Sequence, residues 1–492
     1  MAAGIQKTDS GWVVGPAVVG VAIDSRRVKP GYVFVAIPGS TSDGHNFIGD
    51  ALSRGAVAVV GERSDLTVPV PYFRVPSSRV AAAEIAAAYY GYPSEDLTTV
   101  GVTGTNGKTS VVYWLTALIR AGGKRCGMVS SVVVDNGRGM YESVLTTPES
   151  PDLQGQLRDM QESGMTHAVI EISSHGIAQH RVDQVSLDLA VLTNITREHL
   201  DFHGSMENYV ATKSLLFERM PQDSLGAVIN ADDHYSREVM GRASAPVITY
   251  GIEAGEVRAQ VVERTPWSSV VRLYHPKFDM TARLNHPGTY NVYNLAAAVA
   301  AAFRLGVNAA DIEQAIPTLP EVPGRMQVFK NYGRPTVIVD YAHTPDGLIQ
   351  SLKTVRHMVS GEIWLVFGAR GGRDRGKRPE MGQIAATLAD HVVLTSDSPN
   401  DEDALDIARE IEEGICQVDA SKVASVELDR AQAIRWTVGQ AAADDCVLVT
   451  GRGPELFQYF HQRRVRIKDA EVAEEALGLH DRPKGADGIG IH

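Results

Sequence analysis

The chain has 492 residues, of which 44% are hydrophobic and 22% charged, and its formal net charge is −12. This length is too great for one hydrophobic core and predicts about three domains. The acidic balance argues against a general nucleic-acid-binding protein, whose binding domain is normally basic.

Three cysteines, Cys126, Cys416 and Cys446, lack the paired spacing of a disulfide framework or a zinc knuckle, which favours a reducing cytoplasm. The apolar run Trp12–Ile23 is short and broken by glycine and proline, so it does not resemble a signal peptide. Because no apolar run reaches the roughly 20 residues that cross a bilayer, we expect a cytoplasmic protein without a membrane span.

Residues 1–97 predict a small N-terminal α/β domain. Short apolar strands at Tyr32–Ile37 and Val57–Val60 are separated by glycine and proline, and an alanine-rich helix follows near Val80–Tyr90. Such punctuation between apolar runs is typical of strands joined by turns.

The most informative stretch is Gly-Thr-Asn-Gly-Lys-Thr at Gly104–Thr109, between an apolar strand and a helix predicted over Val111–Ile119. Strand, glycine turn and helix N-terminus together form a phosphate cradle, in which backbone N–H groups face an anion. Lys108 would add positive charge at the outer phosphates, and Thr109 a hydroxyl for Mg²⁺. The loop departs from a strict P-loop, which has glycine at the position of Val102. The alternative to a phosphate site is a tight strand-to-helix turn whose lysine is solvated.

Residues 98–322 predict a central domain in which strands and helices alternate. This alternation indicates a doubly wound, mainly parallel sheet with ligands at the carboxyl ends of its strands. The predicted strands are Ala168–Ile172, Leu189–Leu192 and Ala227–Asn230, the helices are Gln154–Ser163 and Tyr293–Leu305, and a β-rich patch covers Val257–Leu284.

A linker at Pro320–Gly324 leads into a third, Rossmann-like α/β domain over residues 323–478. Its predicted strands are Thr336–Asp340, Ile363–Phe367, His391–Thr395 and Cys446–Thr450. The glycine-containing tail 479–492 is expected to be disordered.

Two further clusters follow strands of the central domain. Glu171 stands at a strand's carboxyl end, where a carboxylate can hold Mg²⁺ opposite the phosphate loop; a surface charge is the alternative. His199 and His203 have the spacing of metal ligands on one helix face, but the following glycine predicts a loop, in which both could be surface histidines.

The order of these motifs resembles the Mur ligase family, and within it the MurE type, over about residues 1–475. The short Gly-Thr-Asn-Gly-Lys-Thr loop is a mark of this family and of its folylpolyglutamate synthetase relatives. The matching motifs are Asp24–Ser25–Arg26, Asp43–Gly44–His45, Gly104–Thr109, Thr146–Thr147–Pro148, Glu171–His175, Asn194–Gly204, Tyr290–Asn294 and Asp340–Asp346.

The resemblance implies a cytoplasmic, monomeric, ATP-dependent acid–amino-acid ligase of peptidoglycan synthesis, and hence of cell wall biogenesis, cell shape and cell division. It would join a free amino acid to UDP-N-acetylmuramoyl-L-alanyl-D-glutamate through an acyl phosphate, with ATP and two Mg²⁺ ions. The N-terminal domain would bind UDP, the central domain ATP and the C-terminal domain the amino acid.

The resemblance also implies a role for each matching residue. The UDP-muramyl dipeptide would contact Ser25, His45, Asn46, Thr146, Thr147, Ser173, Gln179 and Arg181. ATP would contact Gly104, Thr105, Asn106, Gly107, Lys108, Thr109, Asn294, Arg325, Asp340 and His343. The catalytic set would be Lys108, Glu171, His199 and Lys213, and the metal ligands Thr109, Glu171, His199 and Lys213 as its carbamate. The amino acid would contact Arg373, Asp397, Ser398, Asn400, Gly451 and Glu455.

Lys213 is the one member of this set whose role needs a chemical change. Carbamylation, which the resemblance implies, turns its cation into an anion that can hold a second Mg²⁺. The alternative is an ordinary exposed helix lysine.

The acceptor loops depart from the family pattern. Members that use meso-diaminopimelate carry Asp-Asn-Pro-Arg, where this chain has Asp397–Asn400, so the arginine that pairs with the distal carboxylate is missing. An unpaired buried carboxylate is costly, and acidic residues 401–403 follow. This favours a basic diamino acid, L-lysine or L-ornithine, although the acids could simply begin a helix.

Gly451–Glu455 reads Gly-Arg-Gly-Pro-Glu in place of the usual Gly-Lys-Gly-His-Glu. Proline in place of histidine changes the conformations open to the loop. The alternatives are therefore meso-diaminopimelate in the same reaction, an amide ligase diverted to a specialised metabolite, and a nucleotide-binding partner without ligase activity. Intact Lys108, Glu171, His199 and Lys213 argue against the last of these.

Overall fold

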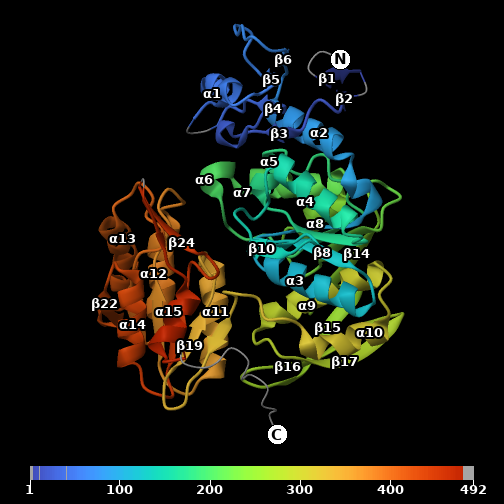
Figure 1. The fold of residues 1–492 in the computed structure, drawn as a ribbon. Coiled ribbons are helices and arrows are strands. Elements are labelled where there is room, and N and C mark those ends of the chain that lie inside the picture. The colour runs from blue at the N-terminus through green and yellow to red at the C-terminus, as the bar shows by residue number, and fades with distance from the viewer. Residues whose placement is uncertain (1–3, 10, 40–41, 462, 480–492) are drawn as a thin grey trace.

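The computed structural model describes residues 4–9, 11–39, 42–461 and 463–479. Three α/β units follow one another along the chain, and each has its own sheet (Figure 1). These sheets lie within the predicted segments 1–97, 98–322 and 323–478; of the expected tail, residues 480–492 lie outside the described part. Among the described residues, every helix is too short or too polar to cross a bilayer.

The N-terminal unit has a four-stranded parallel sheet in the order β3-β4-β5-β6. Helix α2 begins after Ser77, whose side chain accepts a hydrogen bond from the Val80 N–H, and ends at Gly91 with φ of +74°. Its elements are β1 (Ile5–Thr8), β2 (Gly11–Val14), β3 (Gly20–Ala22), β4 (Tyr32–Val35), α1 (Ile48–Ser53), β5 (Ala58–Gly61), β6 (Tyr72–Arg74) and α2 (Ser78–Tyr90).

The central unit has an 11-stranded sheet in the order β10-β9-β8-β11-β7-β12-β13-β14-β15-β16-β17. The strands from β8 to β15 are parallel, and antiparallel strands extend both ends. The predicted β-rich patch therefore extends this sheet. Its strands are β7 (Thr98–Thr103), β8 (Cys126–Val129), β9 (Val133–Asp135), β10 (Met140–Glu142), β11 (His167–Glu171), β12 (Leu189–Leu192), β13 (Gly226–Asn230), β14 (Val247–Gly251), β15 (Val257–Arg264), β16 (Ser269–His275) and β17 (Phe278–Leu284).

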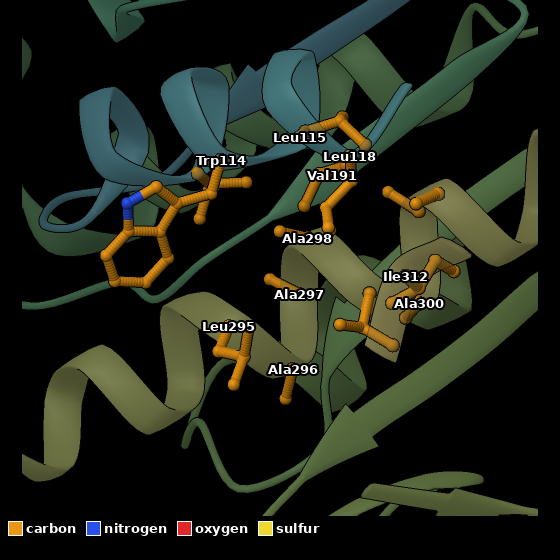
Figure 2. Close-up of a cluster of buried hydrophobic side chains, with 14 of the residues drawn as sticks. Trp114, Leu115, Leu118, Val191, Leu295, Ala296, Ala297, Ala298, Ala300 and Ile312 are labelled. Atoms are coloured by element: carbon orange, nitrogen blue, oxygen red, sulfur yellow. The ribbon is translucent and has the colours of Figure 1, made fainter. Parts of the chain in front are cut away.

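Helices cover both faces of the parallel part. Helices α3 and α9 pack together on one face, where the alanines Ala296–Ala298 let Trp114 and Leu118 approach closely (Figure 2). Trp114 also donates from Nε1 to the carbonyl of Pro320 at 3.1 Å, which ties the linker to the central unit. The helices of this unit are α3 (Lys108–Ala121), α4 (Ser150–Glu162), α5 (Ser174–Ala178), α6 (Leu200–His203), α7 (Met206–Glu218), α8 (Ser236–Arg242), α9 (Thr289–Arg304) and α10 (Ala309–Ala315).

The C-terminal unit lies beside the central one and has a six-stranded sheet, β18-β19-β23-β20-β21-β22, in which only β18 is antiparallel (Figure 1). Its elements are β18 (Gln327–Phe329), β19 (Thr336–Val339), α11 (Pro345–Met358), β20 (Ile363–Phe367), α12 (Lys377–Leu388), β21 (His391–Leu394), α13 (Ala404–Cys416), β22 (Val423–Val426), α14 (Arg430–Gln440), β23 (Cys446–Val449), β24 (Phe457–Phe460), β25 (Arg463–Arg466) and α15 (Asp469–Ala476).

A buried ion pair holds the C-terminal unit together at its strand ends. Both the Arg430 and the Asp469 side chains are fully buried, and the guanidinium donates from Nε and Nη2 to the two carboxylate oxygens at 2.8 and 2.7 Å. The same guanidinium donates to the carbonyls of Thr450 and Ser396, at 2.8 and 3.4 Å. The pair therefore fixes the two loops that follow β21 and β23.

We predict that Arg430→Ala lowers the free energy of unfolding of the C-terminal unit by about 3–5 kcal/mol, because Asp469 is left charged and buried. Urea denaturation followed by tryptophan fluorescence measures the change. Arg435→Ala is the matched control, since its ion pair with Glu475 on the same two helices is exposed and adds little. Equal effects of the two substitutions would contradict this account.

Candidate functional site

The site lies at the carboxyl ends of three adjacent strands, β11, β7 and β12. Glu171 pairs with Val102, and Leu192 with Thr103, so the loops after these strands emerge side by side. The chain runs from β7 to β8 on one side and reaches β12 on the other, which makes β7 the point where the strand order reverses. Ligands of doubly wound sheets bind at such a point.

The loop Gly104–Gly107 needs its glycines for conformation and for space. Gly104 has φ of +145° and Gly107 φ of +84°, values that residues with a side chain rarely adopt. A Cβ on Gly104 would collide with Thr193, and one on Gly107 with Asn294. Gly107 leads directly into α3, so the positive end of this helix meets the loop.

Two lysine side chains reach the same loop from different helices. Lys108 Nζ donates to the carbonyls of Gly104 and Thr105, at 3.1 and 2.8 Å. Lys213 Nζ, from α7, donates to Gly104 O at 2.7 Å. Lys213 is only 1% exposed, which contradicts the exposed-lysine alternative. Burial lowers the pKa of both lysines, and for Lys213 the Lys108 ammonium lowers it further.

Glu171 is buried beside the start of α3, so the surface-charge alternative is wrong. Its Oε1 accepts from Thr109 Oγ1 at 3.2 Å, and its Oε2 from the Ser131 N–H at 2.8 Å. Arg325, from the linker to the C-terminal unit, donates to the same Thr109 hydroxyl at 3.0 Å. In the described residues, no three His, Cys, Asp or Glu side chains gather as a metal-binding group.

The segment after β12 is a loop over residues 193–199, as expected, and ends in a single helical turn, α6 (Leu200–His203). His199 precedes α6 with φ of +56°, and its Nε2 lies 3.5 Å from Glu198 Oε1. His203 points elsewhere, because its Nε2 lies 3.0 Å from the Ser174 hydroxyl in the interior. The two histidines therefore do not act as one ligand pair: His203 is buried, and the half-buried His199 lines a cavity.

Glu198 was missed in the sequence and lies at the centre of the site. This buried carboxylate lies 2.7 Å from His343 Nε2, so it links the central unit to the C-terminal one. Burial raises its pKa, but His199, His343 and Lys108 outweigh this effect and hold the pKa well below its usual range. The sequence offered only a weak signal for this residue: segment 194–204 contains two acids, Glu198 and Asp201, and nothing in the sequence indicates which of them is buried.

A cavity of about 400 Å³ lies between the central and C-terminal units next to the phosphate loop. Its walls include the predicted nucleotide residues Asn106, Gly107, Thr109, Asn294, Arg325 and Asp340, and the unpredicted residues Trp114, Asp232, His286, Tyr290, Tyr293, Asp346 and Gln350. Gly104, Thr105 and Lys108 form the loop behind this wall. His343, predicted for the nucleotide, lies in a neighbouring cavity instead.

The neighbouring cavity holds most of the predicted amino-acid residues, namely Arg373, Asp397, Gly451 and Glu455. Ser398 and Asn400 do not line it. Ser398 Oγ accepts from the Tyr459 N–H at 3.3 Å, and Asn400 Nδ2 donates to the Gly371 carbonyl at 2.7 Å. Both side chains support neighbouring backbone in this structure, in place of the cavity wall in which they were expected.

The acids after Asn400 also serve the fold. Asp403 caps α13 through the N–H groups of Leu405 and Asp406, and Glu402 pairs with buried Arg378 at 2.9 Å. Asp401 pairs with His461. The helix-start alternative therefore holds for Asp403, and none of the three lines the cavity.

The predicted dipeptide residues gather between α4 and α5. Thr147 Oγ1 accepts from the Ser173 N–H at 2.9 Å, and Arg181 donates to the Thr147 carbonyl at 2.8 Å and to Gln179 Oε1 at 2.7 Å. Thr146 is half-buried beside Thr147.

In the N-terminal unit, Ser25 is buried and Asn46 is exposed. His45 is buried with both ring nitrogens engaged, Nδ1 with Asp43 at 2.6 Å and Nε2 with the Glu62 N–H at 2.9 Å. It therefore supports the turn 43–46 from behind, and Asn46 is the accessible side chain of the two. Arg27 pairs with Asp152 of α4 and connects the two units.

Comparison with known proteins adds family models over most of the chain. The Mur ligase family catalytic domain matches residues 17–90, the Mur ligase middle domain residues 102–302, and the Mur ligase glutamate ligase domain residues 324–453. Together these matches span all three units.

Similar proteins cover nearly the full length. The UDP-N-acetylmuramoyl-L-alanyl-D-glutamate–2,6-diaminopimelate ligase of Geobacillus thermodenitrificans is 42% identical over 471 residues, 94% of this chain and 95% of that protein. The ligase of the same name from Listeria monocytogenes is 37% identical over 470 residues, 93% and 95% of the two chains.

Solved structures of ligases also resemble this chain over nearly its full length. A ligase of that same name shares 31% identity and a TM-score of 0.63 over 95% of this chain and 96% of that one. A MurF ligase from Thermotoga maritima, solved in complex with ADP, shares the fold, with 22% identity and a TM-score of 0.67 over 94% and 99%.

We predict that acid destabilises the site region. Burial lowers the pKa of His175 to about 4 and that of His199 to about 3, whereas an unfolded histidine titrates near pH 6.5. Below about pH 6.5 these histidines become protonated in the unfolded chain but stay neutral in the folded chain. Their contribution to the free energy of unfolding is therefore complete above this pH and is lost as the pH falls toward 4.

The measurement is the melting temperature between pH 7.5 and 4.5. His175→Phe should flatten this dependence, since its ring already packs on Phe202, and His357→Gln at an exposed position should not. A wild-type slope in His175→Phe would contradict the assignment.

Proposed function

The chain belongs to the Mur ligase family, and we propose that it joins a diaminopimelate to UDP-N-acetylmuramoyl-L-alanyl-D-glutamate, with ATP, in peptidoglycan synthesis. The relatives with this printed name support the acceptor. These relatives favour diaminopimelate, the alternative acceptor, and do not support the preferred L-lysine or L-ornithine. The preference for lysine rested on Asn400 and on the acidic residues 401–403. The Asn400 side chain is turned to Gly371, and none of the three acids lines the cavity, so these residues do not set its charge.

One observation carries the proposal: the phosphate loop and the acceptor cavity meet at Glu198. This carboxylate contacts His343 at 2.7 Å and lies in the wall of the cavity that holds Arg373, Asp397 and Glu455. Its charge also interacts with Lys108 in the loop. A group bound at the loop and one bound in the cavity would therefore be neighbours, as transfer between them requires.

The reaction follows from these neighbours. A carboxylate oxygen of the dipeptide attacks the γ-phosphorus of ATP, ADP leaves, and an acyl phosphate forms. The acceptor nitrogen then attacks the acyl carbon, loses a proton, and phosphate leaves as the amide forms. Lys108 and the N-terminus of α3 stabilise the negative charge on the transferred phosphoryl group.

The residues present fit a magnesium ion at the loop. Thr109 and Glu171 bring a hydroxyl and a carboxylate within 3.2 Å of each other, and Mg²⁺ takes one or two carboxylates together with substrate phosphates. When bound, the ion neutralises phosphate charge. We propose Thr109 and Glu171 for a first ion, and His199 and carbamylated Lys213 for a second.

Carbamylation of Lys213 is chemically suited to its surroundings. Burial and Lys108 favour the neutral amine, which is the form that reacts with CO₂. The product is an anion, so it would be attracted to the Lys108 ammonium, which shares the Gly104 carbonyl with the unmodified Lys213.

The remaining substrate would lie across the N-terminal and central units. We propose that Ser25 and the turn 43–46 contact UDP, and that Thr146, Thr147, Ser173, Gln179 and Arg181 hold the muramyl dipeptide. The free cysteines support a reducing cytoplasm.

We predict that the purified chain releases phosphate from ATP with the UDP-muramyl dipeptide and meso-diaminopimelate, at a higher kcat/KM than with L-lysine or L-ornithine. Single-acceptor phosphate assays measure this, with the dipeptide omitted as the control. Absence of phosphate release with every amino acid would refute the proposed function.

Lys213→Ala should lower kcat by about 10²–10³-fold, because the proposed carbamate ligand of the second Mg²⁺ is lost and with it part of the charge stabilisation of the transferring phosphoryl group. Acetate or formate should restore part of the activity by supplying a carboxylate. Lys353→Ala, at an exposed lysine on α11, is the control. Full activity of Lys213→Ala without added carboxylate would rule out the carbamate.

A further inference from the structure

Arg370 enters the acceptor cavity at the carboxyl end of β20, and nothing in the family motifs pointed to it. It lines the cavity together with Arg373, Asp397 and Glu455. Its Nη1 donates to Glu455 Oε1 at 3.0 Å, and its guanidinium carbon lies 5.9 Å from the centre of the Tyr459 ring. The side chain is 32% exposed, so part of it faces the open space of the cavity.

The other cations of this wall also have partners, of which the contact of Arg373 with Asp201 is long, at 3.5 Å. Arg197 pairs with Asp374 at 3.1 Å, and Lys377 Nζ donates to the His343 carbonyl at 2.9 Å. Among the described residues, Glu455 is the sole hydrogen-bond acceptor found for the Arg370 guanidinium, which has five N–H donors. Arg370 therefore keeps donors for a ligand.

Asp397 supplies the complementary charge. It is 4% exposed, and its Oδ1 has no hydrogen-bond partner among the described residues. An unpartnered buried carboxylate oxygen on a cavity wall suits an ammonium group. Burial opposes the charge of Arg370, but Glu455 and Asp397 outweigh it and raise the pKa of Arg370.

The backbone around Arg370 is held in place from the loop after β21. Asn400 Nδ2 donates to the Gly371 carbonyl at 2.7 Å, and the Gly371 N–H donates to the Ser398 carbonyl at 3.0 Å. Asn400 adopts φ of +54°, a conformation that asparagine tolerates better than most residues. Asn400 thus orients the strand end that carries the cation.

We propose that Arg370 is a specificity-determining residue that binds the second carboxylate of the acceptor. This inference rests on the proposed function. Two guanidinium groups, Arg370 and Arg373, and two carboxylates, Asp397 and Glu455, line one cavity, and they match an acceptor with two carboxylates and two amino groups. L-Lysine has only one carboxylate, so it would leave one guanidinium without its partner.

The test compares meso-diaminopimelate with L-lysine, because these two acceptors differ only in the distal carboxylate. Arg370→Gln should lower kcat/KM for meso-diaminopimelate by about 10- to 100-fold, the loss of charge-assisted hydrogen bonds, mainly through KM. For L-lysine kcat/KM should stay unchanged or rise, since Glu455 becomes free for its ammonium. The KM values for ATP and the dipeptide should not change.

Two variants complete the design. Arg370→Lys keeps the charge but loses the planar fork, so its preference should lie between wild type and Arg370→Gln. Arg375→Gln, in the same loop, removes an exposed arginine that pairs with Glu410 and should keep the wild-type preference.

The outcomes separate the two proposals. If the wild-type chain uses meso-diaminopimelate and Arg370→Gln loses activity with both acceptors alike, or retains its preference, Arg370 does not bind the second carboxylate and only this inference fails. A wild-type preference for L-lysine would overturn both this inference and the proposed diaminopimelate acceptor. If the wild-type chain releases no phosphate with any acceptor, the proposed function fails and this inference with it.

Discussion

The amino groups of Lys108 and of buried Lys213 share one carbonyl oxygen, and much of the central unit is arranged around this constraint. Lys108 and Lys213 both donate to Gly104 O, at 3.1 and 2.7 Å. Two cations this close are costly out of water, and the buried carboxylate of Glu198 offsets only part of their charge. The site therefore attracts anions, which is what binding a nucleotide triphosphate demands. The glycines of the loop and the start of α3 serve the same end, since both expose N–H groups to an anion.

The C-terminal unit completes this site through polar contacts. Asn106 reaches Asp346 at 3.3 Å, Arg325 reaches Thr109 at 3.0 Å, and Glu198 reaches His343 at 2.7 Å. Each of these contacts joins a residue of the central unit to the C-terminal unit or to the linker that leads into it. Contacts of this kind are exchanged with water more easily than an apolar interface. They suit units that must admit three substrates and then bring them together.

The local parts of the site could be predicted from sequence, and the long-range parts could not. Strand, glycine loop and helix follow each other within about a dozen residues, so the local sequence is enough to predict a phosphate-binding loop at Gly104–Thr109. The burial of Lys213 depends on α7 packing against that loop, about a hundred residues away. The orientation of the Asn400 side chain depends on distant parts of the chain. The Asn400 N–H donates to the Tyr459 carbonyl, and the side chain donates to the Gly371 carbonyl. The cation that we propose for the distal carboxylate, Arg370, follows a different strand from the one that precedes Asn400.

The account's central claim is that one chain couples phosphoryl chemistry at the loop to an acceptor with two carboxylates. The most direct measurement is a competition: ATP, Mg²⁺ and the UDP-muramyl dipeptide are incubated with the chain and equal concentrations of meso-diaminopimelate and L-lysine. Mass spectrometry then distinguishes the two UDP-muramyl tripeptides, whose masses differ by one CO₂. The account predicts that the diaminopimelate product dominates, and a mixture dominated by the lysine product would contradict it.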